Sequence, residues 1–111
     1  MAKSAHMIQM EFGQAQAQAE ELEKIARDIG RIADNNFENV LSGIGSAWKS
    51  DSSAEYIRKG RKVQDELRES MEELTKSASV IRRIAKTTYD AEMKAISIAQ
   101  ISGGRGGMGG R

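Results

Sequence analysis

The sequence predicts an all-α protein, an antiparallel two-helix hairpin that dimerises into a four-helix bundle. Three observations lead to this fold class. The chain of 111 residues contains no proline, so no ring interrupts a long helix. Apolar residues recur three and four positions apart in two long stretches, which is the spacing of one helical face. A short segment rich in glycine and serine, "GSAWKSDSS" at residues 45–53, separates the two stretches and favours antiparallel pairing.

The first predicted helix covers about residues 7–43. Its apolar stripe consists of Ile8, Phe12, Ala15, Ala19, Leu22, Ala26, Ile29, Ala33, Phe37, Val40 and Ile44. Gly13 and Gly30 each cost roughly 1 kcal/mol against alanine, but the stripe continues in phase across both. We therefore expect one helix, in which Gly30 permits a bend or close packing.

The second predicted helix covers about residues 53–100, after a turn at about 44–52. Ser52 or Ser53, with Glu55 close behind, is the predicted N-cap. Residues 1–101 then form one hairpin domain. The remainder, 102–111, has glycine at six positions and is predicted to be a disordered tail, because glycine loses the most entropy on ordering.

A two-helix hairpin leaves part of each apolar stripe in contact with water. A second hairpin is the natural way to cover it, and this argument predicts the dimer. The residues expected on the core and dimer face are Leu22, Ile29, Ile57, Val63, Leu67, Met71, Leu74 and Ile81.

The only tryptophan lies in the predicted turn. In one interpretation, Trp48 caps the open end of the bundle while Gly43 and Gly45 let the backbone reverse. In the other, the turn and the ring together form a surface for a partner. The residues assigned to this turn motif are Trp48, Lys49 and Ser50.

The residue types that carry catalysis are scarce, and no enzyme activity is predicted. The chain has no cysteine and one histidine, His6, which has no fixed partner in the sequence. Its acidic clusters fall on solvated helical faces, so no metal site is expected. The glycine-rich tail lacks the lysine and Ser/Thr of a phosphate loop. No cofactor is expected.

Charge and hydropathy also limit the partners. The net charge is +1, and the sharpest basic patch is "RKGRK" at residues 58–62, with only Tyr56 as a neighbouring aromatic residue. Nucleic acid is not an expected partner. The tail resembles a fragment of an arginine-glycine RNA-binding segment, but a flexible exported or docking tail is the preferred interpretation. Neither a signal peptide nor stable membrane insertion is expected, because no long apolar run exists.

The turn "GIGSAWKSDSSAEY" between two long amphipathic helices resembles the WXG family, the ESAT-like substrates of type VII secretion. The resemblance covers about residues 7–100, and Tyr56 matches the aromatic residue that follows the family's turn. The family motif is Trp-x-Gly, where this chain has Ser50 at the third position. The family's export signal is Tyr-x-x-x-Asp/Glu, where this chain has Met93 at the fourth position after Tyr89. Asp90 and Glu92 are the acidic residues left for a degenerate signal.

The resemblance implies a non-enzymatic protein that is exported without a cleavable signal peptide, is cytoplasmic before export and is then secreted or held at the cell surface. Its partners would be a second copy and the type VII export ATPase. An alternative is an adaptor that pairs with the helical hairpin of a larger toxin or effector and delivers it to the same machine. A third interpretation is a cytoplasmic coiled-coil spacer. Membrane lysis is not expected as the main activity.

Overall fold

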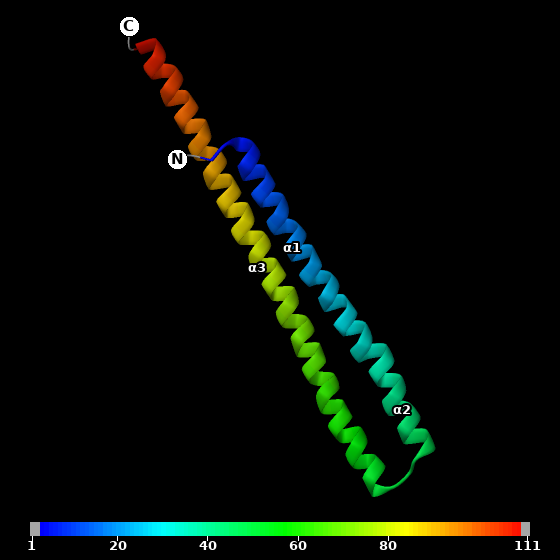
Figure 1. Ribbon diagram of the computed structural model, residues 1–111. Coiled ribbons are helices and arrows are strands. Elements are labelled where there is room, and N and C mark those ends of the chain that lie inside the picture. The colour runs from blue at the N-terminus through cyan, green and yellow to red at the C-terminus, as the bar shows by residue number, and fades with distance from the viewer. Residues whose placement is uncertain (1–2, 110–111) are drawn as a thin grey trace. The chain divides into compact units, whose positions relative to one another are not determined.

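A computed structural model describes residues 3–109, and all regular secondary structure in this range is helical. The elements in order are α1 (Ala5–Arg31), a π-helical segment η1 (Ile32–Phe37), α2 (Glu38–Ala47) and α3 (Asp51–Gly109), labelled or coloured by position in Figure 1. The predicted all-α class is confirmed.

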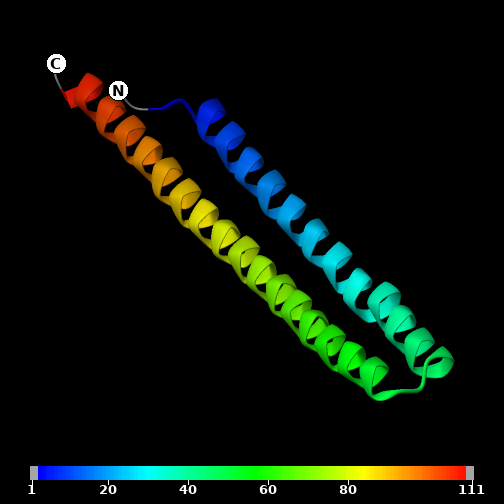
Figure 2. The same cartoon turned by 60° about the horizontal axis from the view of Figure 1, so that its bottom comes forward.

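The helices contribute to two compact units. Unit 1 contains the residues up to Ala19 and those from Ser79 onward, and unit 2 contains Glu20–Ala78. In unit 2, α2 and the beginning of α3 run antiparallel and side by side in both views (Figures 1 and 2). The predicted helical hairpin is confirmed for this unit.

The helices of unit 2 meet along what we call the inner seam, which consists of Ala26, Ala33 and Leu41 facing Ile57, Gln64 and Met71. Two glycines allow the close approach. A Cβ atom at Gly60 would collide with the Leu41 side chain, and one at Gly30 would lie 2.5 Å from the Met71 sulfur. Of the two roles predicted for Gly30, the structure shows close packing.

The apolar stripe of the first helical stretch changes phase at η1, which the sequence did not predict. Ala26 and Ala33 are buried seven residues apart, but the next buried residue, Leu41, follows after eight. A π-helical turn holds one more residue than an α-helical turn, so η1 absorbs the extra position. Val40, which the in-phase stripe placed inside, is 60% exposed, whereas Leu41 is 4% exposed. The prediction that the stripe continues in phase is therefore wrong for this segment.

The connection between α2 and α3 is shorter than predicted. It comprises residues 48–50 rather than about 44–52, because α2 continues to Ala47 and α3 begins at Asp51. The described glycines have no positive φ, so Gly43 and Gly45 do not reverse the chain. The reversal starts instead at Trp48, whose backbone is extended at φ −132° and ψ 104°. Gly45 has a different role, since a Cβ there would contact Ile57 at 3.4 Å.

Helix α3 also continues beyond the predicted limit of residue 100. The segment predicted to be a disordered tail, 102–111, is helical as far as Gly109, and residues 110 and 111 lie outside the described residues. Once a helix exists, each added residue gains one hydrogen bond, and this lets it extend into poor helix formers. Among residues 3–109, no helix combines the length and apolar character that crossing a bilayer requires.

Candidate functional site

The predicted turn motif forms the whole connection at the end of the unit 2 hairpin. Trp48 ends α2, where its backbone N–H donates to the Ile44 carbonyl at 2.9 Å. Its ring lies 5.8 Å from the Tyr56 ring, centroid to centroid, at a tilt of 50°. Both rings remain largely accessible, with Trp48 45% and Tyr56 63% exposed. The turn therefore presents two neighbouring aromatic rings to solvent.

Ser50 begins α3 by a reciprocal pair of hydrogen bonds with Ser53. The Ser53 backbone N–H donates to the Ser50 hydroxyl at 3.2 Å, and the Ser50 N–H donates to the Ser53 hydroxyl at 3.0 Å. These contacts satisfy donors that a helix start leaves free, in the manner of a capping box. The N-cap is thus Ser50, and the predicted Ser53 serves as its partner three residues on. Ser50 therefore has a structural role at the start of α3.

Five large apolar or aromatic residues form an exposed stripe on unit 2, which we call the outer strip: Ile25, Ile32, Val40, Tyr56 and Val63. Each of them directly precedes a residue of the inner seam in the sequence. In an antiparallel helix pair, positions just before the seam lie on the same flank of both helices. The outer strip is therefore contributed by both sides of the hairpin, and no part of unit 2 covers it.

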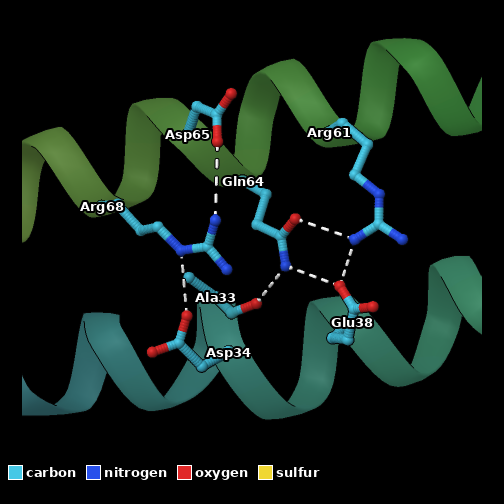
Figure 3. Close-up of polar contacts among 7 residues, drawn as sticks. All are labelled: Ala33, Asp34, Glu38, Arg61, Gln64, Asp65 and Arg68. Carbon is cyan, nitrogen blue, oxygen red and sulfur yellow. Dashed lines mark hydrogen bonds and ion pairs between the residues drawn. The ribbon is translucent and has the colours of Figure 1, made fainter.

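The opposite flank of unit 2 is polar and is organised around Gln64 (Figure 3). The Gln64 amide nitrogen donates to the Ala33 carbonyl of η1 at 2.8 Å and to Glu38 at 3.0 Å. Its amide oxygen accepts from Arg61 at 3.1 Å, and Arg61 also pairs with Glu38. We call Gln64, Ala33, Glu38 and Arg61 the Gln64 cluster. Sequence reasoning missed it, because a single glutamine between apolar positions gives no periodic signal.

A second ion pair continues the same flank. Arg68 donates from Nε to the Asp34 carboxylate at 3.0 Å and lies 3.5 Å from the Asp65 carboxylate (Figure 3). Both the Arg68 and the Asp34 side chains are substantially exposed. Exposed pairs of this kind contribute little to stability, so this pair helps mainly to define the alignment of η1 with α3.

Hydrogen bonds from Arg61, and then from Gln64, hold the pKa of the Glu38 carboxyl below its usual value of 4.5. A depressed folded-state pKa contributes stability above the unfolded value, and that stability is lost as the pH falls through the folded value. We expect Glu38→Gln to reduce the loss of melting temperature between pH 6 and pH 3, measured by circular dichroism. Glu66→Gln changes an exposed carboxylate on α3 and is the control. Equal pH profiles for wild type and Glu38→Gln would contradict the assignment.

The candidate export residues lie in unit 1, on α3. The Tyr89 ring is half-buried and packs on Phe12 of α1 with the centroids 4.6 Å apart. Asp90 is exposed and pairs with Lys86 at 3.1 Å. Glu92 lies 3.4 Å from Lys3, whose pKa is raised by the hydrogen bonds that its ammonium donates to Glu11 and Glu92. Tyr89 and Glu92 thus participate in the packing of unit 1, and Asp90 faces solvent.

Unit 1 carries an exposed stripe of its own on α3. Val80 and Ile84 lie four residues apart, Ile98 and Ile101 lie three apart, and all four are exposed. Thr87, Ala91 and Lys94 lie between them at the same alternating spacing. Lys94 lies within this stripe, as Asp28 and Lys59 lie within the outer strip at the same spacing.

The residues predicted for the core and dimer face are mostly half-buried. This holds for Leu22, Ile29, Ile57, Leu67, Met71, Leu74 and Ile81. Val63 differs, since it lies on the outer strip and Gln64 occupies the buried position beside it.

In the comparison with known proteins, no family model, no curated protein and no solved structure matches this chain. Among residues 3–109, no three acidic, histidine or cysteine side chains gather as a metal site would require.

Proposed function

We propose that this chain is a non-enzymatic exported protein, a type VII secretion substrate that acts as a homodimeric four-helix bundle. The observation that carries the proposal is the outer strip. Water contacts five large side chains along one flank of a small hairpin, and burying them is favourable by roughly 25 cal/mol per Å². A second hairpin is the simplest partner that covers a strip supplied by two antiparallel helices.

The charges of the two units support a second copy as that partner. Unit 2 contains ten Lys and Arg against thirteen Asp and Glu, a net charge of −3. Unit 1 contains seven Lys and Arg against three Asp and Glu, a net charge of +4. Unit 2 of one copy is therefore complementary to unit 1 of another, which favours an antiparallel dimer.

The proposed mechanism of export uses the surface of this dimer. The Trp48 turn of one copy would lie beside the Tyr89–Glu92 segment of the other, and the export ATPase would bind both. The supporting observation is that the turn presents its rings to solvent, although Trp48 is large enough to pack inside.

The adaptor remains the second candidate, and one observation favours it. Glu21 and Asp28 precede outer-strip residues by four positions, and Glu66 follows Val63 by three. These three carboxylates outnumber the one lysine at the same spacing, Lys59. A different hairpin with basic borders would match this surface as well as unit 1 of a second copy does. In that case the chain escorts a larger toxin or effector.

The test combines solution mass with an export assay. The chain has a mass of 12.2 kDa, and we expect light scattering to give twice this value for the wild type. Ile32→Glu should give a monomer, because it places a charge in the strip, whereas Asn39→Glu adds the same charge to α2 outside the strip and should remain dimeric. Trp48→Ala should stay dimeric and lose export.

Each result has a distinct consequence. If the wild type is a monomer that folds only together with another hairpin, the adaptor replaces the homodimer as the proposed function. Normal export of a dimeric Trp48→Ala variant would contradict the role of the turn. Retention of the wild type in cells that have a working type VII machine would leave only the third interpretation, a cytoplasmic coiled-coil spacer.

A further inference from the structure

Gln64 is the only large polar side chain of the inner seam, and it is 1% exposed. Leucine would fill a similar volume at this position without an amide that needs partners. Burying an amide costs roughly 1–3 kcal/mol unless its hydrogen bonds are replaced. Here the replacement is complete, because both the nitrogen and the oxygen of the Gln64 amide have partners within 3.1 Å.

The acceptor that Gln64 uses is specific to one place on the partner helix. It is the main-chain carbonyl of Ala33, inside the π-helical segment where the helix changes phase. A regular α-helix uses its carbonyls in its own ladder of hydrogen bonds, so another helix would seldom offer the same acceptor. Glu38 and Arg61 then complete the contacts of the amide from the two sides of the hairpin (Figure 3).

Helix α3 has a second face that competes with the inner seam. Ile57, Gln64, Met71 and Ala78 recur every seven residues on the inner face. Tyr56, Val63, Ser70 and Ser77 recur with the same period one position earlier, on the outer face. Both faces have the spacing that packs against another helix. Ser70 and Ser77 make the outer face the less apolar of the two, so apolar contacts favour the inner face. Apolar side chains tolerate shifted alignments, however, so these contacts alone do not fix the register of α3 against its partner.

We propose that the Gln64 cluster is the specificity determinant of helix pairing in this protein. It commits the Gln64 face of α3 to η1 of its own chain and thereby keeps the Tyr56–Val63 face free for a partner. A polar side chain at one seam position is known to fix pairing and register in helical assemblies at some cost in stability. This inference concerns the hairpin itself and holds whether or not the protein is exported.

The decisive variant is Gln64→Leu in the full chain, observed through the single tryptophan. In wild type the Trp48 indole N–H gives one NMR signal, as it would also in a symmetric dimer. In Gln64→Leu we expect two or more indole signals, or one broadened by exchange, because leucine needs no particular acceptor and allows alignments of α3 that would leave the buried amide without partners. The melting temperature should be unchanged or higher, since an apolar residue replaces a buried polar one.

Lys62→Leu is the matched control, because it adds the same side chain two positions away at an exposed site. It should retain a single indole signal. If Gln64→Leu also gives one sharp signal at the wild-type position, the cluster does not select the pairing and the proposal is overturned. A Gln64→Leu chain that is unfolded, or that melts at a lower temperature with one indole signal, overturns the proposal too. The amide would then stabilise the fold without selecting how the helices pair.

Discussion

Leu41→Ala is expected to lower the free energy of unfolding by about 3 kcal/mol, as is usual for a leucine truncated inside a core. Leu41 is 4% exposed, and its methyl groups rest directly on Gly60, where no side chain can move in to fill the space. The close backbone of α3 thus limits relaxation around the cavity. Urea unfolding followed by circular dichroism measures the loss.

The matched control is the neighbouring residue. Val40→Ala should cost about 0.5 kcal/mol or less in dilute protein, because Val40 is 60% exposed. The comparison tests the phase change at η1, since an unbroken α-helix from Ala33 would bury residue 40 and expose residue 41. A larger loss for Val40→Ala than for Leu41→Ala would show that the helix does not change phase there.

The phase change explains how far the sequence alone could predict this fold. Alternating steps of three and four identified two helices, and the absence of proline made their length credible. The in-phase stripe failed at Val40 because it fitted one period to the whole stretch. The residues from the end of η1 onward contain the corrected phase, since Phe37, Leu41 and Ile44 recur at four and three and are the larger apolar residues. A period fitted separately to each end would have revealed the extra residue.

The candidate sites were predictable to different degrees. The aromatic turn was located because Trp48 is unique and lies between the two stripes. The cap at Ser50 was misplaced by two or three residues, since four serines and an aspartate in this segment are all competent caps. The Gln64 cluster had no sequence signal. The role of Gln64 depends on the main-chain carbonyl of Ala33, 31 residues away, which comes within hydrogen-bond distance only when the two helices pair.

The effect of a glycine-to-alanine substitution on stability should change sign according to the residue that faces the glycine. Gly60→Ala is expected to destabilise the wild-type chain. The new Cβ would collide with Leu41, and overpacking of this kind typically costs 1–3 kcal/mol, more than the roughly 1 kcal/mol that alanine gains over glycine in a helix. In the Leu41→Ala background the obstructing methyl groups are gone. There Gly60→Ala should stabilise the protein by about 1 kcal/mol.

Gly43→Ala is the control for this pair of measurements, because a Cβ at Gly43 would meet nothing within 4 Å. It should stabilise the chain by about 1 kcal/mol in both backgrounds, through helix propensity alone. If Gly60→Ala behaved like Gly43→Ala in the wild type, the close contact between Leu41 and Gly60 would be refuted. A sign change confined to Gly60 would locate the closest approach of α2 and α3 at the residue that the phase change brings inside. The π-helical turn would then be the feature that aligns the leucine with the glycine.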